Sequence, residues 1–124
     1  MSSRPPRERW DSAFKALAAA PRRELVVRLQ ECAAGESVSL PDAAIRPDAP
    51  VDRERLALAL HHQHLPRLAN SGYVRWTDEP FRARRGPRFA EIATVLEAIA
   101  DAADRFPAAM DADYHRLEGT TEHD

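Results

Sequence analysis

Arginine is the residue type of this chain whose abundance and spacing first suggest chemistry. There are 17 arginines and a single lysine, Lys15, and four arginines crowd into residues 82–88 as RARRGPR. No acidic residue lies between Pro80 and Arg88. Because a guanidinium keeps its charge and matches phosphate oxygens, these four predict contact with phosphates or a narrow minor groove: Arg82, Arg84, Arg85 and Arg88. A solvated, arginine-rich loop is the plainer interpretation.

Charge is distributed unevenly along the chain. The formal net charge is -2 at neutral pH, but residues 1–88 hold 16 basic and 11 acidic side chains, whereas residues 89–124 hold 2 and 9. A surface that binds nucleic acid needs local positive potential, while the rest of the molecule can carry either sign. We therefore expect a polyanionic partner for the first part of the chain.

A long helix is expected over residues 51–71, where leucines recur at spacings of four, five and three. On a helical wheel, the side expected to pack inward holds Leu56, Ala57, Leu60, His61, His64, Leu65 and Leu68. The opposite side holds Arg55, Ala59, His62, Gln63, Pro66 and Asn70. Pro66 removes one backbone hydrogen bond, so the phase of the helix should change nearby.

The outer side of this helix suits the major groove of DNA. Arginine pairs with guanine O6 and N7, and glutamine pairs with adenine N6 and N7. We expect Arg55, His62 and Gln63 to meet base edges, with Arg55 and Gln63 the strongest candidates. Arg53 and Arg67 lie near the boundary between the two sides and suit phosphates.

The run His61-His62-Gln63-His64 invites a metal-site hypothesis. The three side chains point in different directions around a helix, whereas helical metal ligands need a spacing of three or four residues. We expect no metal here. His61 and His64 should instead be hydrogen-bonded on the inner side, and His62 should be exposed.

No motif indicates catalysis or a cofactor. A glycine-rich phosphate loop, a G-x-S-x-G elbow and an H-E-x-x-H pair are all missing from the sequence, so we expect a protein that is not an enzyme. Cys32 is the single cysteine, which excludes an intrachain disulfide, and we expect it to be a small buried hydrophobe. Since no run of 18 apolar residues and no apolar leader occurs, a cytoplasmic protein without membrane contact is expected.

The elements that position these residues follow from periodicity and from proline and glycine. Helices are expected at about 8–20, from Pro21 to just before Gly35, at about 40–46, at 51–71 and at 89–106. Ser39 and Asp42 have the spacing of a capping box for the third helix. An extended segment at 37–40, a strand at 73–77 and a basic loop at 80–88 complete the order, and residues near Arg88 can pair back as a second strand.

One domain is expected, from residue 8 to residue 106. A flexible N-terminus, residues 1–7, precedes it, and a loose acidic tail, residues 107–124, follows it. The fold class is mainly α with a small β-hairpin, in the order of a winged helix-turn-helix domain with an additional C-terminal helix. In that design the long helix enters the major groove, and the hairpin loop lies beside it on phosphates or in the minor groove.

Two stretches of the chain also resemble known regulators. FKALAAAPRRELVVRLQE, residues 14–31, is similar to the opening helix pair of arsenical-repressor-like winged-helix regulators. HHQHLPRLANSGYVRW, residues 61–76, resembles a haloarchaeal winged-helix family with an HLPKL…aGvV segment, most of whose members have no assigned function. The resemblance implies a small, intracellular, dimeric transcriptional regulator of a halophilic archaeon. The metal-sensing members carry a cysteine pair on the recognition helix, and residues 51–71 contain no cysteine.

These observations predict a sequence-specific regulator that binds double-stranded DNA. A homodimer is expected through the helix 89–106, whose apolar stripe is larger than a small domain needs, although a helix that only covers the monomer core is the alternative. The competing function is a winged-helix module for protein contact, an adaptor or antitoxin-like partner, whose acidic last third binds a basic protein. The basic loop next to a polar helix face favours DNA.

Overall fold

Helices make up most of the chain, and a small antiparallel sheet completes it. The structure is a computed structural model and describes residues 6–48 and 50–107. Its elements, in order, are α1 (Pro6–Ala16), α2 (Ala20–Glu31), β1 (Ser37–Ser39), the 3-10 turn η1 (Asp42–Ala44), α3 (Arg53–Ala59), the π-helical segment η2 (Leu60–His64), α4 (Leu65–Asn70), β2 (Val74–Thr77), β3 (Arg82–Arg85), α5 (Phe89–Asp101) and the 3-10 turn η3 (Ala103–Arg105). The expected mainly helical fold with a small β component is confirmed.

The sheet has three strands in the order β1-β3-β2, and both pairings are antiparallel. The expected hairpin is present, but β1 extends it to a third strand. The return strand β3 lies inside the stretch 80–88, where the sequence predicted a loop, so that prediction was wrong. The reason is an alternation that the arginines conceal: Ala83 is buried between outward-facing Arg82 and Arg84, which is the period of a half-buried strand.

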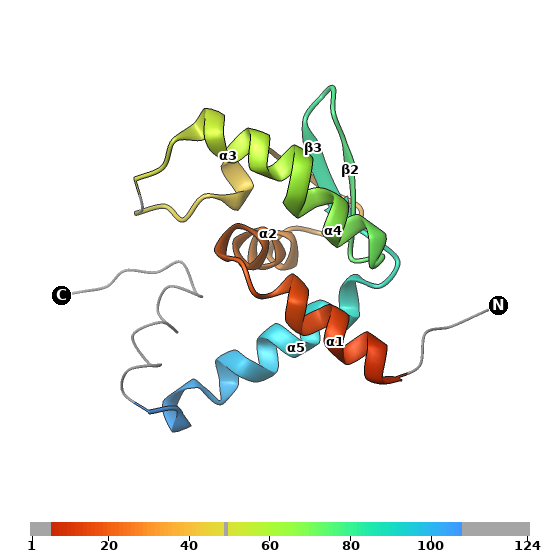
Figure 1. Cartoon of the computed structure of the whole chain (residues 1–124), viewed down its shortest axis with the longest axis vertical. Helices are drawn as coiled ribbons and strands as arrows, with labels where there is room; N and C mark the ends of the chain where they lie inside the picture. Colours follow the sequence, from red (N-terminus) through yellow and green to blue (C-terminus); the bar gives the residue numbers. More distant parts are fainter. Residues whose placement is uncertain (1–5, 49, 108–124) are drawn as a thin grey trace.

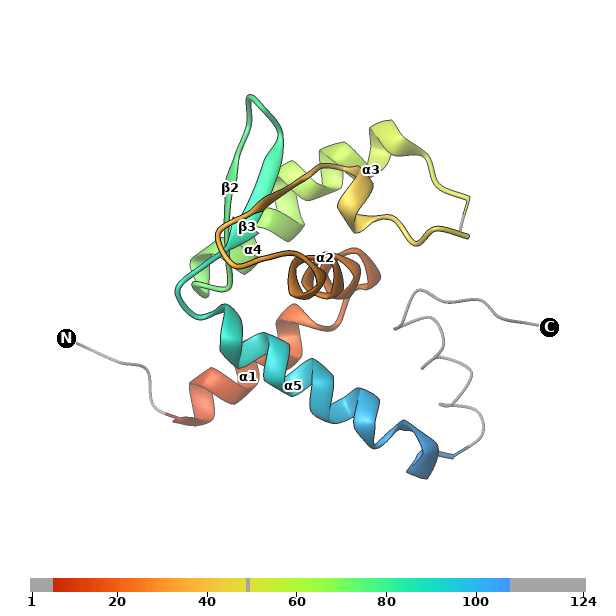
Figure 2. The same cartoon turned by 180° about the vertical axis from the view of Figure 1, so that it is seen from behind.

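Helix α2 lies between two layers of the molecule, as both views show (Figures 1 and 2). On one side are α3, α4 and the sheet, and on the other side are α1 and α5. The turn of the β2–β3 hairpin projects past the helices of its own layer (Figure 1). The hairpin turn and the α3–α4 helix therefore lie at the same end of the molecule (Figure 1).

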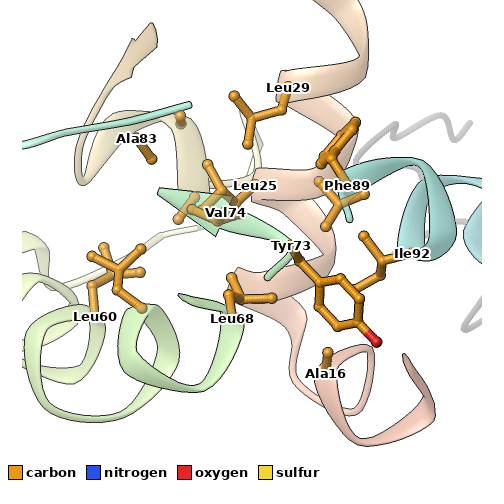
Figure 3. Close-up of a cluster of buried hydrophobic side chains, with 14 of the residues drawn as sticks. Ala16, Leu25, Leu29, Leu60, Leu68, Tyr73, Val74, Ala83, Phe89 and Ile92 are labelled. Carbon is orange, nitrogen blue, oxygen red and sulfur yellow. The ribbon is translucent and has the colours of Figure 1, made fainter. Parts of the chain in front are cut away.

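A single hydrophobic core joins all the main elements. Figure 3 shows its centre, where Val74 of β2 and the preceding Tyr73 meet Leu25 and Leu29 of α2 and Ile92 of α5. These five side chains are at most 1% exposed. Fully burying an aliphatic side chain contributes about 1.5–3 kcal/mol, so this cluster is a substantial part of what holds β2 and α5 against α2.

Several element ends differ from the sequence predictions. The first helix was expected at 8–20 but spans Pro6–Ala16, so Pro6 and Arg7 belong to a helix rather than to the N-terminal segment. Ala19 is extended and begins the turn into α2. The last helix ends at Asp101 and is followed by η3. Except for Pro107, the predicted tail lies outside the described residues.

The third helix and its capping box were also predicted wrongly. Only the short 3-10 turn η1 forms, and no side chain caps it. Ser39 cannot serve as the cap because it belongs to β1, where its hydroxyl oxygen accepts a hydrogen bond of 2.8 Å from Arg82. Arg82, which holds the Ser39 hydroxyl, thus lies 43 residues further along the chain.

The aromatic residues of α1 do not pack inward, although their spacing of four residues places them on one side of the helix. Trp10 and Phe14 are 56% and 54% exposed, and their rings lie 5.7 Å apart. The inner side of α1 is formed instead by the small residues Ala13 and Ala16, with Leu17 following the helix. Small residues let α1 approach its neighbours closely, which leaves the two large rings outside.

Candidate nucleic-acid interface

The elements α3, η2 and α4 form one continuous helix from Arg53 to Asn70, here called the long helix (Figure 1). It begins at Asp52, whose carboxylate accepts a hydrogen bond of 3.1 Å from the backbone N–H of Arg55. An aspartate at this position satisfies a backbone N–H that has no partner within the helix, and its negative charge is stabilised by the positive end of the helix dipole. The cap therefore fixes where the polar outer face starts.

A change of helical phase keeps all four leucines of the long helix in the core. Leu56 is 8% exposed, and Leu60, Leu65 and Leu68 are fully buried. In η2 the N–H of Leu65 bonds to the carbonyl of Leu60, five residues back instead of four. This wide turn absorbs the extra residue in the spacing and lies directly before Pro66, whose ring does not fit an ordinary helical turn. The predicted adjustment near Pro66 is confirmed.

The outer side of the long helix carries free polar side chains. Those that are exposed and make no side-chain hydrogen bond or ion pair with another described residue are Arg55, His62, Gln63, Arg67 and Asn70. Arg53 is also exposed, but it forms an ion pair with Asp42 of η1. Ala59 and Pro66 are half-buried. The predicted base-reading residues thus lie together on one accessible surface.

His64 joins the long helix to the beginning of α2. It is 7% exposed, and its Nδ1 lies 2.8 Å from the guanidinium of Arg22, which is 5% exposed. Because arginine only donates, Nδ1 must accept, so the ring is neutral with its proton on Nε2. Burial lowers the pKa of His64, and the charges of Arg22 and Arg67 lower it further. Its predicted place on the inner side is confirmed.

His61 joins the long helix to the hairpin turn. Its Nδ1 lies 3.0 Å from the carbonyl oxygen of Ala57, and its Nε2 lies 2.7 Å from the carboxylate of Asp78. The ring also stacks on Phe81 at 4.3 Å and meets the edge of Trp76 at 5.5 Å. Both nitrogens face acceptors, so only the doubly protonated imidazolium donates both bonds. The hydrogen bond to Asp78, followed by that to Ala57, raises the pKa of His61.

Two of the four clustered arginines are engaged in contacts inside the protein. The guanidinium of Arg85 donates to carbonyl oxygens at the end of α2, at 3.1 Å to Leu29 and 2.9 Å to Cys32, and lies 5.0 Å from the ring of Phe89. Arg82 donates to the hydroxyl oxygens of Ser37 and Ser39 at 2.6 and 2.8 Å. These contacts fix the sheet to α2 and join β3 to β1.

The other two clustered arginines are less constrained. Arg84 is exposed on β3, and Arg88 is half-buried at the start of α5, where its side chain lies against Gly72. Neither side chain has a hydrogen bond or ion pair within residues 6–48 and 50–107. Arg75, which the sequence analysis did not select, is exposed on β2 directly opposite Arg84. The signal that could have found it is its outward position in the alternating strand 73–77.

The hairpin turn is acidic, in contrast to the strand that follows it. Asp78 and Glu79 are both exposed there, and they precede Pro80 and Phe81. Asp78 is paired with His61, whereas Glu79 has no such partner in the described part of the chain. The positive charge of the hairpin therefore lies along β2 and β3 and not at the tip.

Buried polar contacts also fix α2. Glu24 is 3% exposed and forms an ion pair of 3.2 Å with Arg28, which also donates to the carbonyl of Ile45. Burial raises the pKa of Glu24, while Arg28 acts in the opposite direction. Cys32 is half-buried rather than fully buried, and its thiol lies near the carbonyl of Leu29. None of these groups reaches the outer face of the long helix.

Comparison of the chain with protein-family models, with curated proteins and with solved structures found no match. Within the described residues, no group of three or more His, Cys, Asp or Glu is arranged to hold a metal ion. No helix in that part of the chain is both long and apolar enough to cross a bilayer.

Proposed function

We propose that this protein is a sequence-specific regulator that binds double-stranded DNA with a winged helix-turn-helix domain. The observation that carries the proposal is the division of the long helix into two sides. One side buries four leucines, while the other exposes Arg55, His62, Gln63, Arg67 and Asn70 without competing contacts. A helix of this kind fits the major groove, where arginine and amide side chains can read base edges.

The order of the elements supports this proposal. A helix pair precedes the long helix, and an antiparallel sheet with a projecting hairpin stands beside it (Figure 2). In winged domains the recognition helix and the hairpin contact the same duplex. The resemblance of residues 61–76 to a haloarchaeal winged-helix family points in the same direction.

Within this proposal, the residues divide between base reading and phosphate contact. Arg55 and Gln63 take the base edges, with His62 beside them, and Arg67 takes a phosphate. Arg53 would first exchange its ion pair with Asp42 for a phosphate contact. Of the clustered arginines, Arg84 and Arg88 are available for phosphates. Arg82 and Arg85 are fixed by internal hydrogen bonds, and Arg82 keeps two N–H donors for a ligand.

A second copy of the chain is the proposed partner of α1 and α5. The exposed rings of Trp10 and Phe14 lie next to a hollow of about 560 Å³ that Trp10, Ala90, Thr94 and Val95 help to line. Two-fold dimers present two recognition helices to palindromic sites, which fits the proposed DNA binding. We expect the W10S/F14S double variant to sediment as a monomer where the wild type sediments as a dimer. A wild-type monomer at all concentrations would contradict this part of the proposal.

Selection from a random pool of DNA duplexes tests the main proposal without knowledge of the operator. The purified full-length protein should enrich a shared sequence motif over several rounds. On the selected duplex, Gln63→Ala and Arg55→Ala should each weaken binding by about 1–3 kcal/mol and relax the preference at one base pair. Arg105→Ala is the matched control, because Arg105 is exposed on η3, away from the long helix.

Two results would overturn the proposal. One is the absence of any enriched motif for the wild type. The other is an equal loss of affinity in the Arg105→Ala control and in the Arg55→Ala variant, which would mean that only net charge matters. In either case, isolation of a stable complex with another protein would favour the alternative, a module for protein contact.

A further inference from the structure

The outer face of the sheet consists entirely of guanidinium and hydroxyl side chains. Residues that lie directly opposite in an antiparallel sheet share a face, so the register of the three strands defines this surface. It is here called the outer sheet face, and its six members are Ser37, Ser39, Arg75, Thr77, Arg82 and Arg84. The opposite face holds Val74, Ala83 and Trp76 and packs on the core.

The charges of this face are uncompensated. Arg75 and Arg84 lie directly opposite each other, both are exposed, and neither forms an ion pair or side-chain hydrogen bond with a described residue. Like charges at directly opposite positions destabilise a sheet. An ordinary solvated face mixes both signs, whereas this one has three arginines and no carboxylate. An anion that bridged the pair would relieve this repulsion.

The third arginine of the face is held in place. Arg82 donates to the hydroxyl oxygens of Ser37 and Ser39, at 2.6 and 2.8 Å, and to the carbonyl oxygen of Ser37 at 2.8 Å. A guanidinium has five N–H donors, so two are left for a ligand. A hollow of about 270 Å³ lies on this face, with Arg75, Arg82 and Arg84 among its lining residues.

We propose that the outer sheet face binds phosphate groups of a nucleic-acid backbone, with Arg75 and Arg84 sharing one phosphate and Arg82 contacting the next. Arginine, serine and threonine are the side chains that protein–DNA interfaces direct at phosphates. An acidic peptide would also bring apolar side chains. The six outward positions of this face offer them no apolar partner, and the apolar part of the hollow is limited to Trp76, Pro80 and Ala83. The identity of the polyanion rests on the proposed function, whereas phosphate binding by the arginine pair does not.

This surface is distinct from the outer side of the long helix. The inner face of the sheet packs on the core, and its Trp76 meets His61 of the long helix, so the outer sheet face looks away from that helix. A duplex bound through the long helix would reach this face only with the backbone that passes the edge of the hairpin, so the sheet would contact phosphates outside the groove that the helix occupies. The sheet would add affinity and salt dependence without adding sequence preference.

The test compares two double variants that remove the same charge, R75Q/R84Q on the sheet and R7Q/R105Q on α1 and η3. Arg7 and Arg105 are exposed and lie on the elements farthest from the hairpin (Figure 1). Binding of the full-length proteins to a 30-base-pair duplex, a length of about three helical turns, is measured at several NaCl concentrations. Because Arg75 and Arg84 share one phosphate, its loss should reduce the slope of log K against log[NaCl] by about 0.9 in R75Q/R84Q, and R7Q/R105Q should keep the wild-type slope. Equal slopes in the two variants would overturn the proposal.

A second measurement separates this inference from the proposed function. Side-chain Nε–Hε signals of the arginines are followed by NMR while sodium phosphate replaces sodium chloride at constant ionic strength. Selective, saturable shifts of Arg75 and Arg84 support the phosphate site even if the protein binds no duplex, in which case only the proposed function fails. Shifts no larger than those of Arg7 and Arg105 would overturn the site even if the duplex is bound. Unchanged circular dichroism confirms that R75Q/R84Q folds.

Discussion

The long helix and the β2–β3 hairpin are attached to the same core by different means. The helix is held chiefly by buried leucines, and most of its polar side chains face outward without partners among the described residues. The hairpin has few apolar anchors beyond Val74 and Ala83, and its arginines do part of the work of attachment. Apolar anchoring leaves polar side chains free for a ligand, whereas polar anchoring engages them within the protein.

Helix ends explain where many of the arginines go. The last carbonyl groups of a helix have no partner within it, and a guanidinium can bond several of them at once. Arg22 donates to Lys15 and Ala16 at the end of α1, and Arg85 donates to Leu29 and Cys32 at the end of α2. The many arginines of this chain therefore form hydrogen bonds inside the protein as well as giving its surface positive charge.

The largest expected loss of stability comes from truncation of a buried leucine in the long helix. Leu60 is fully buried, so Leu60→Ala should lower the free energy of unfolding by about 2–5 kcal/mol. Leu58, two residues earlier, is 61% exposed. Leu58→Ala should therefore change the free energy of unfolding by less than about 0.5 kcal/mol. Urea unfolding followed by circular dichroism measures both. Similar losses in the two variants would show that the helix is not anchored through one side.

A close approach of backbones at the base of the hairpin gives the next largest effect. A Cβ on Gly86 would lie 2.6 Å from the carbonyl oxygen of Gly72 and 2.8 Å from the backbone nitrogen of Val74. Both are backbone atoms, and the Gly72 oxygen also accepts a hydrogen bond from the N–H of Arg88. They cannot move aside easily, so Gly86→Ala should destabilise by about 3 kcal/mol. Gly35 has φ of +93° but open space around it, so Gly35→Ala should cost only about 1–2 kcal/mol. Thermal unfolding of the two variants measures both losses of stability. A larger loss for Gly35→Ala than for Gly86→Ala would contradict the packing described for Gly86.

The adjacent residues Arg84 and Arg85 separate attachment from ligand contact. Arg85→Ala removes the bonds to Leu29 and Cys32 and should cost about 2 kcal/mol of stability. Arg84→Ala removes the same charge from an exposed position and should change stability by less than about 0.5 kcal/mol, while it weakens duplex binding. Chemical denaturation and anisotropy binding on both variants measure the two effects. Equal losses of stability would mean that Arg85 is not an anchor.

The sequence predicted the long helix well because its signal is local. The leucine spacing of four, five and three indicates which side of the helix is buried and also that a wide turn precedes Pro66. The inward positions of His61 and His64 followed from the same wheel, although their partners did not. Asp78 and Arg22 lie 17 and 42 residues away, and nothing in a periodic pattern specifies such pairs.

The hairpin was predicted less well because four arginines obscured a strand. The buried Ala83 is too small to mark an apolar alternation, so the stretch resembled a loop. Which guanidinium is free depends on tertiary contacts: Arg82 reaches Ser37 and Arg85 reaches α2 across more than 40 residues of sequence. For the same reason the exposure of Trp10 was not foreseen, since it depends on how closely α1 approaches α5.

The two inward-facing histidines of the long helix should give opposite, smaller effects of pH. The pKa of His61 is raised in the fold, so its contribution to stability is complete below the unfolded value near 6.5 and is lost as pH rises through the folded pKa. The pKa of His64 is lowered, so the unfolded chain takes up the proton first, and stability falls as pH drops below about 6.5. Stability from this pair should therefore be greatest near neutral pH and decline on both sides.

Substitutions of Asp78 and His64 separate the alkaline decline in stability from the acid decline. Asp78→Asn removes the carboxylate that favours the imidazolium of His61, so the alkaline decline should shrink while the acid decline stays. His64→Gln keeps an oxygen that can accept from Arg22 but cannot be protonated near neutral pH, so the acid decline should shrink instead. Chemical denaturation across the pH range, with NMR titration of each ring, measures both. If Asp78→Asn leaves the alkaline limb unchanged, the contact between His61 and the hairpin turn does not couple the two regions in solution, and the hairpin is held by its arginines and the core alone.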